Sequence, residues 1–265
     1  MPNIDQRKPG SFCWMELATT DQNAAKIFYG SLFGWTAKDE PMGPSDVYTM
    51  FQIDGKFTGA AYTLRPDQHA AGVPPHWMLY IAVENADAST EQAGKAGATV
   101  IMPPFDVMDA GRMSVLRDPT GAHFCIWQPL RSTGIQLSGE PGTLCWADLN
   151  TPDPAAAKKF YGDLFGWQFA EDTHPGLPTG YAHIQNGGEH IGGIAPLRPE
   201  CAEVPAHWLS YLLVSDCDAT AAKATQLGAK FHLEPMTMEN VGRFGMLADP
   251  QNAVFAIFQP LPKSA

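Results

Sequence analysis

The chain has 265 residues, of which 45 % are hydrophobic and 17 % charged, so it can bury a real core and does not have the composition of a disordered protein. Its 28 acidic residues outnumber 17 Lys and Arg, and the net charge of −11 argues against nucleic acid and anionic membranes as partners. Five cysteines without a CxxC pair, no apolar leader and no long apolar run predict a cytoplasmic protein.

The predicted elements of the first half begin with a short strand at residues 12–17. Thr19, Thr20 and Asp21 follow and are residue types that cap helices, and the helix after them should end at Gly34. A second helix is predicted over 86–97. The remaining predicted strands lie at 47–53, 58–64, 76–83, 99–102, 113–117 and 123–128. This order gives two consecutive β-α-β-β-β modules.

The chain then repeats itself. Residues 10–37 and 142–169 are identical at 16 of 28 positions without a gap, and PPHWMLYIAV at 74–83 matches PAHWLSYLLV at 205–214. In the second half, Thr151 followed by Pro152 predicts the start of the matching helix. We therefore predict an α+β fold with four β-α-β-β-β modules and helices outside cupped mixed sheets.

The repeat also predicts the domain boundaries. The first half should span residues 1–130 and the second half residues 142–265, and the polar stretch 131–141 has the composition of a linker.

Several motifs carry a family resemblance. They are FYGSLFGW (28–35), FYGDLFGW (160–167), AVENADA (82–88), RDPTGAHFCIW (117–127) and ADPQNAVFAIF (248–258). With these motifs the chain resembles the vicinal oxygen chelate superfamily, which includes glyoxalase I, bleomycin-resistance proteins and extradiol dioxygenases. The resemblance implies a tandem glyoxalase-like fold whose members bind drugs, isomerise thiohemiacetals or open aromatic rings. It specifies the fold more closely than the function, because one fold hosts many chemistries.

The resemblance also implies where metal ligands would stand. The strands at 58–64 and 191–197 contain no histidine or carboxylate. The other family positions are occupied here by Trp14, Met78, Cys125, Trp146, Leu209 and Ala256. We therefore expect no cofactor and keep a displaced divalent metal site as the alternative.

A polar cluster is predicted inside the first cup. Strand residues two apart share a face, so Glu16, His76, Tyr80, His123 and Trp127 should line the cup with the family positions. His76 and His123 belong to one module and are the candidate proton-transfer residues. The carboxylate beside them is Glu16 if the first two modules form a cup, and Asp148 if the second and third do. The candidate ligand-binding residues are Trp14, Glu16, Met78, Tyr80, Cys125, Trp127, Trp146, Asp148 and His207.

The second half lacks one of these histidines, since Val254 stands where the first half has His123. This asymmetry suggests that the two cups differ in function. His183 and His190 lie near the turn signal Asn186-Gly187-Gly188 and are expected to be surface residues of a hairpin.

Three functional hypotheses follow. The first is a protein that binds a small apolar or aromatic molecule in a cup between modules, without a required metal. The second is a lyase, isomerase or hydroxylase-like enzyme acting on a small carbonyl or aromatic substrate. The third is an interaction protein that keeps the fold and has lost its site. The chain would be a monomer or a homodimer, because the duplication supplies internally a pairing that single-half proteins obtain by dimerising.

Overall fold

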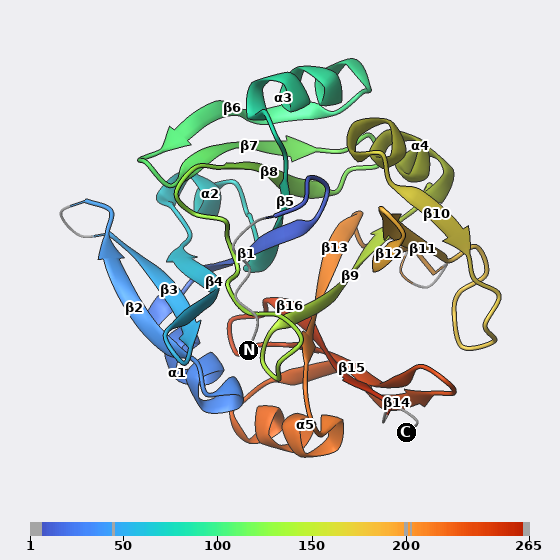
Figure 1. Cartoon of the computed structure of the whole chain (residues 1–265). Coiled ribbons are helices and arrows are strands. Elements are labelled where there is room, and N and C mark those ends of the chain that lie inside the picture. Colours follow the sequence, from blue (N-terminus) through green and yellow to red (C-terminus); the bar gives the residue numbers. More distant parts are fainter. Residues whose placement is uncertain (1–6, 44–45, 199–200, 202, 262–265) are drawn as a thin grey trace.

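The computed structural model describes residues 7–43, 46–198, 201 and 203–261, and it contains two eight-stranded sheets, one from each half of the chain (Figure 1). The strands of the first half are β1 (Phe12–Thr19), β2 (Thr36–Pro41), β3 (Val47–Ile53), β4 (Lys56–Thr63), β5 (His76–Ala82), β6 (Thr99–Val107), β7 (Gly111–Arg117) and β8 (His123–Pro129). Its helices are α1 (Gln22–Phe33), α2 (Pro66–Ala70) and α3 (Ala86–Lys95).

The second half repeats this order. Its strands are β9 (Leu144–Thr151), β10 (Gln168–Glu171), β11 (Ala182–Asn186), β12 (Glu189–Pro196), β13 (His207–Leu213), β14 (Lys230–Met238), β15 (Gly242–Ala248) and β16 (Val254–Pro260). Its helices are α4 (Pro154–Phe165) and α5 (Cys217–Gln226). The predicted α+β fold with four β-α-β-β-β modules is confirmed.

The strand order shows which modules share a sheet. It is β2-β3-β4-β1-β5-β8-β7-β6 in the first sheet and β10-β11-β12-β9-β13-β16-β15-β14 in the second. At the centre of each sheet the first strands of two modules pair antiparallel, β1 with β5 and β9 with β13. Modules one and two therefore form one cup and modules three and four the other, so Glu16 lies in the cup of His76 and His123, and Asp148 lies in the second cup.

Neighbouring residues determine where α1 begins and ends and where α4 begins. Asp21 caps α1 by accepting a hydrogen bond from Ala24 N, and Gly34 ends it with a φ of 73°, which favours glycine. The predicted start of α4 at Thr151 is wrong by two residues. Asp153 is the cap, because its side chain accepts from Ala156 N, and Pro154 takes the first helical position.

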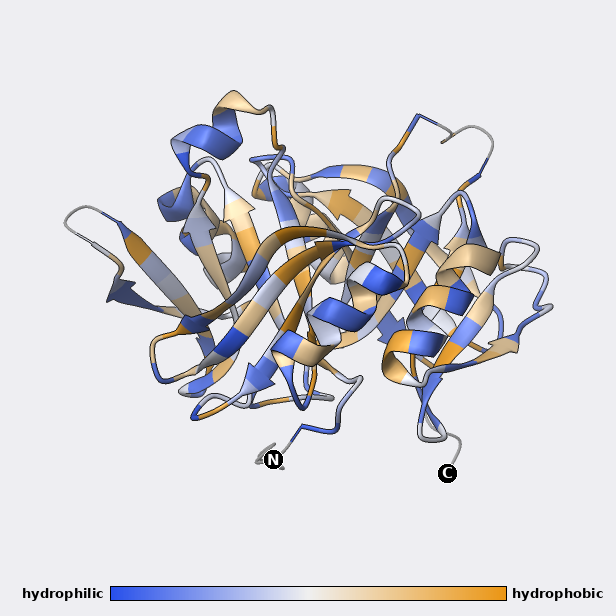
Figure 2. Cartoon of the chain, turned by 90° about the horizontal axis from the view of Figure 1, so that it is seen from above, coloured by the Kyte–Doolittle hydropathy of each residue, from blue (hydrophilic) through white to orange (hydrophobic). Residues whose placement is uncertain are grey.

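The helices of one half pack against the helices of the other. Figure 1 shows α1 beside α5 and α3 beside α4, and these pairs are in contact. Buried residues of the helices belong to clusters that also contain strand residues. Figure 2 shows hydrophobic stretches among the strands and mixed colouring along the helices. Each buried cluster accordingly draws on both halves: Phe28 packs against Phe255, and Phe124 packs against Phe160.

The two halves are also joined by a hydrogen-bond chain that the repeat builds twice. The Trp77 indole donates to the Tyr29 hydroxyl (3.0 Å), which donates to Asp249 of the other half (2.9 Å). Its counterpart runs from Trp208 to Tyr161 (3.1 Å) and on to Asp118 (2.9 Å). The repeated FYG motif therefore contributes to the interface between halves.

The segment predicted as a linker packs along the first sheet. Ile135 N donates to Cys13 O, and Gln136 N donates to Phe57 O, while Ile135 and Leu137 are buried. Within the part of the chain that the structure describes, no helix is both long and apolar enough to span a membrane.

Candidate functional site

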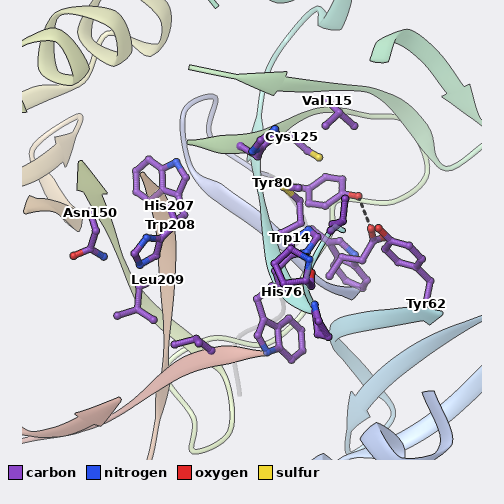
Figure 3. Close-up of a pocket in the computed structure, with 18 of the residues that line it drawn as sticks. Trp14, Tyr62, His76, Tyr80, Val115, Cys125, Asn150, His207, Trp208 and Leu209 are labelled. Carbon is purple, nitrogen blue, oxygen red and sulfur yellow. Dashed lines mark hydrogen bonds between the residues drawn. The ribbon is translucent and has the colours of Figure 1, made fainter. Parts of the chain in front are cut away.

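The concave faces of the two sheets line a cavity of about 2760 Å³, which exceeds the volume of a typical single-ligand pocket. All eleven candidate residues from the sequence lie along it. Figure 3 shows Trp14, Tyr62, His76 and Tyr80 on one side and Asn150, His207, Trp208 and Leu209 on the other. The cavity therefore has room for a molecule in each cup.

The first cup contains a carboxyl group held by aromatic side chains. Tyr80 donates to Glu16 Oε1 at 3.1 Å, and this hydrogen bond is the dashed line at the Tyr80 hydroxyl in Figure 3. Tyr48 donates to Glu16 Oε2 at 2.5 Å, and the Trp14 indole donates to the Tyr48 hydroxyl at 3.1 Å. These contacts fix the carboxyl group on β1, at the centre of the sheet.

The electrostatics of Glu16 follow from this environment. Burial raises the pKa of its carboxyl group, and the hydrogen bonds from Tyr48 and Tyr80 oppose that rise. A carboxylate has about four acceptor sites. Two are used by the tyrosines, so Glu16 keeps acceptor capacity for a bound molecule.

The two histidines of this cup lie at its edge. His76 Nδ1 is 2.8 Å from Pro74 O, which orients the ring, and desolvation lowers the pKa of His76. The exposed His123 also has a lowered pKa, mainly from desolvation, with further contributions from Arg117 and from the charge of His76. The sequence expectation that both residues line one cavity agrees with the structure, while their catalytic role stays a prediction.

The wall of the first cup is largely apolar and aromatic. Trp127 is almost fully buried, and its ring packs edge-on against Tyr80 with 6.5 Å between centroids. Cys125 pairs with Tyr80 in the register, two residues before Trp127 on β8, and burial raises the pKa of its thiol well above its ordinary value. A thiol of this kind behaves as a small apolar group, which fits a wall better than a nucleophile.

The second cup repeats the carboxyl cage with different residues. Asp148 Oδ1 accepts hydrogen bonds from the Trp146 indole (2.8 Å) and the Tyr181 hydroxyl (2.9 Å), and Oδ2 accepts from Tyr211 (2.9 Å). Burial raises the pKa of this carboxyl group. His207 lies at the rim, with Nδ1 2.9 Å from Pro205 O, as His76 does in the first cup.

The predicted hairpin is present and His190 is exposed, but the prediction of a surface position is wrong for His183, which is half-buried. His183 Nε2 lies 2.7 Å from Asp172 Oδ2, and the imidazole lines the cavity. The alternation of Tyr181 and His183 could have indicated a shared face, because residues two apart point the same way. The Asn-Gly-Gly turn that begins three residues later instead favoured a position at the surface.

The donors present do not fit the metal centre that the resemblance implies. Trp14 and Met78 occupy family positions in the first cup, and Trp146 and Leu209 do so in the second. Among residues 7–43, 46–198, 201 and 203–261, no group of three or more His, Cys, Asp or Glu side chains could hold a metal ion.

Comparisons with known proteins agree with this architecture. A family model described as "Glyoxalase/Bleomycin resistance protein/Dioxygenase superfamily" matches residues 11–126 and 127–257. The chain is 40 % identical to "Putative glyoxylase CFP32" of Mycobacterium tuberculosis, covering 99 % of this chain and 100 % of that protein. It is 34 % identical to "Anthracycline biosynthesis protein DnrV" of Streptomyces peucetius, covering 95 % and 94 %.

Solved structures share the fold at lower sequence identity. The Mn(II)-bound glyoxalase from Novosphingobium aromaticivorans matches with a TM-score of 0.66 and 17 % identity, over 96 % of this chain and 83 % of that one. The 2,3-dioxygenase LapB from Pseudomonas sp. KL28 matches with a TM-score of 0.64 and 13 % identity, over 100 % and 96 %. The chain belongs to the Glyoxalase/Bleomycin resistance protein/Dioxygenase superfamily.

Proposed function

We propose that this protein binds a small, mainly aromatic molecule in its first cup, without a required metal. The observation that carries the proposal is the Glu16 carboxyl group, fixed by Tyr48 and Tyr80 and left with acceptor capacity. It would accept a hydrogen bond from a hydroxyl or amino group of the ligand, while Trp14 and Trp127 contact the ring system. Pockets with apolar walls and a few fixed polar groups are typical ligand sites.

The names of two relatives support an aromatic ligand. DnrV of Streptomyces peucetius and DauV of Streptomyces sp. strain C5 are named anthracycline biosynthesis proteins. Anthracyclines are fused-ring aromatic compounds that carry hydroxyl and amino groups. A molecule of that class presents both features that the first cup would recognise.

A matched pair of probes tests the role of Glu16. Calorimetric titration should show that 2-naphthol binds at least tenfold more tightly than 2-methylnaphthalene, which has the same shape and no hydrogen-bond donor. A buried polar group left without its hydrogen-bond partner costs about 1–3 kcal/mol, and 1.4 kcal/mol is tenfold in affinity. Glu16→Ala should remove this preference, and Asp148→Ala, in the other cup, should keep it.

Two outcomes would contradict the proposal. One is equal affinity of the wild-type protein for the two probes. The other is a preference for 2-naphthol that persists in Glu16→Ala and disappears in Asp148→Ala, which would assign binding to the second cup.

An enzyme remains the second candidate: a lyase, isomerase or hydroxylase-like activity on a small carbonyl or aromatic substrate. The contact of His76 Nδ1 with Pro74 O favours it, because it leaves Nε2 free to exchange a proton beside His123.

We also propose the cytoplasm as the location, since all five cysteines are free thiols. The net charge of −11 supports a small molecule as the partner in preference to nucleic acid or a membrane surface. The protein would act as a monomer or a homodimer.

A further inference from the structure

The methionines of this chain gather at the cavity. The sequence has eleven, all but Met1 lie among the described residues, and eight of these line the cavity. Six belong to the first half, namely Met42, Met50, Met78, Met102, Met108 and Met113. The second half contributes two, Met238 and Met246. Thioether side chains therefore form much more of the first cup than of the second.

Two of these methionines lie on either side of Glu16 in the sheet. Met78 on β5 pairs with Glu16 in the register, while Met50 on β3 pairs with Ala60, which pairs with Glu16 on its other side. Both methionine side chains are half-buried and pack against a buried hydrophobic cluster. Flexible side chains therefore lie next to the carboxyl group that the proposed ligand would contact.

The repeat supplies a comparison within the same molecule, because other residue types stand at the matching positions of the second cup. The matching pairs are Met50 and His183, Met78 and Leu209, Met102 and Leu233, and Met113 and Phe244. The second cup keeps the carboxyl cage without this methionine wall. The fold therefore does not require methionine at these four positions, and a role in binding is the reason that fits their place along the cavity.

Methionine differs from leucine and phenylalanine in how it meets a ligand. Its side chain is unbranched, with three rotatable bonds and a polarizable sulfur, so it fits surfaces of different shape and attracts aromatic rings. Met42 and Met108 extend this property to the mouth of the cavity, since both line it and are 65 % and 84 % exposed. A wall of this kind can close around ring systems of more than one size.

We propose that the first cup accepts fused-ring aromatic hydroxy compounds of different ring number, and that its methionines determine this breadth. The inference rests on the proposed function and deepens it: Glu16 would hold the hydroxyl group that these ligands share, while Met50, Met78 and Met102 rearrange around their rings. The cavity volume of about 2760 Å³ leaves room for ring systems larger than naphthalene. Met78 and Met102 are specificity-determining residues and take part in no chemical step.

A series of probes measures the breadth of binding. Fluorescence titration of the full-length protein should show that 9-phenanthrol and 1-hydroxypyrene bind at least as tightly as 2-naphthol, because larger rings bury more apolar surface. Met78→Ile combined with Met102→Ile keeps the side-chain volume nearly constant and introduces stiff, β-branched side chains that strands tolerate well. This variant should keep its affinity for 2-naphthol within about threefold and lose roughly tenfold for 1-hydroxypyrene, the scale of an overpacked site.

The second half supplies the matched control. Met238→Ile combined with Met246→Ile makes the same exchange on the second-half wall of the cavity and should leave the affinities for all three probes unchanged. A further readout on the wild-type protein does not depend on any variant. The ε-methyl carbon shift in NMR reports the last side-chain torsion of methionine, and for Met50 and Met78 it should differ between the complexes with 2-naphthol and with 1-hydroxypyrene.

Three outcomes would overturn the inference and leave the proposed function standing. One is binding of 2-naphthol without binding of the two larger probes. Another is an affinity for 1-hydroxypyrene that is unchanged in the Met78 and Met102 variant and lost in the Met238 and Met246 variant. The third is a set of methionine methyl shifts that is the same in both complexes. Failure of the proposed function has a different signature, namely 2-naphthol binding that does not depend on Glu16.

Discussion

Glu16 and Asp148 each follow a tryptophan by two residues, and each accepts hydrogen bonds from two tyrosines of its own half. The cages differ in one respect that matters for binding. The Trp146 indole donates directly to Asp148, whereas the Trp14 indole donates to Tyr48 and leaves Glu16 with two donors. Glu16 therefore keeps more acceptor capacity for a ligand than Asp148 does, which supports the proposal that the ligand binds in the first cup.

Burial of Glu16 has a consequence for stability. It raises the pKa of the carboxyl group above its ordinary value of 4.5, so folding favours the neutral form. The stabilisation is complete below pH 4.5 and is lost as the pH rises through the folded-state pKa. Glu16→Gln removes this titration, so its free energy of unfolding relative to the wild type should increase as the pH rises above 4.5. Urea unfolding at a series of pH values measures it.

The exposed Glu84 supplies the control for this series. Glu84→Gln should change the free energy of unfolding by a nearly constant, small amount. If the free energy of unfolding of Glu16→Gln differed from that of the wild type by the same amount at every pH, burial would not favour the neutral carboxyl group.

Some of these residues could be predicted from the sequence and others could not. Side chains along a strand point alternately to its two faces. Counting in steps of two from Trp14 and from His76 therefore predicted residues that line the cavity. Tyr48 and Tyr181 escaped prediction. Tyr48 lies on β3 and Tyr181 directly precedes β11, and only the strand order of each sheet brings them near β1 and β9. Nothing in the sequence around either tyrosine specifies its partner carboxyl group.

Helices α1 and α4 connect the halves through Tyr29 and Tyr161. Each hydroxyl accepts from a buried tryptophan and donates to a buried aspartate of the opposite half. Asp118 and Asp249 also accept hydrogen bonds from the backbone of their own turns, through the other oxygen. The DP turn and the FYG motif are therefore parts of one interface.

Removal of either hydroxyl should destabilise the protein. Tyr29→Phe leaves an Asp249 oxygen and the Trp77 indole without their partner, and an unsatisfied buried group costs about 1–3 kcal/mol. Tyr161→Phe should have a similar cost on the other side. The free energy of unfolding from urea titration measures both.

Tyr62→Phe is the comparison, because Gln68 is the one hydrogen-bond partner of the Tyr62 hydroxyl among the described residues, and the position is partly exposed. Its cost should stay below about 1 kcal/mol. Equal costs for all three variants would contradict the role of the interface chains.

The elements that the sequence missed lie at sheet edges or in turns. β2 is an edge strand of mainly exposed residues, so it has no hydrophobic alternation to reveal it. β6 continues through Pro103 and Pro104, where the sequence predicted an end at residue 102. Proline is tolerated there because β6 is the other edge strand and has register shifts at this point.

On the scale of the whole molecule, duplication produces two similar cups joined through their helices. Self-similarity was sufficient to predict two matching halves, and the order of strands and helices within a half predicted its two modules. It could not predict which modules share a cup, because adjacent modules can pair in either way. The structure places modules one and two together, and the resulting cups share a carboxyl cage but differ at Met50 and His183.

The central claim is that an aromatic ligand occupies the first cup, and the indole N–H signals of the tryptophans test it directly. Trp14 and Trp127 line that cup, whereas Trp35 and Trp167 are buried and donate to Gly142 O and Gly10 O away from it. Proton–nitrogen NMR with one equivalent of 2-naphthol, with signals assigned from single Trp→Phe variants, should shift the first pair and leave the second unchanged. Shifts confined to Trp146 and Trp208, or no shift at Trp14 and Trp127 with ligand bound, would contradict the claim.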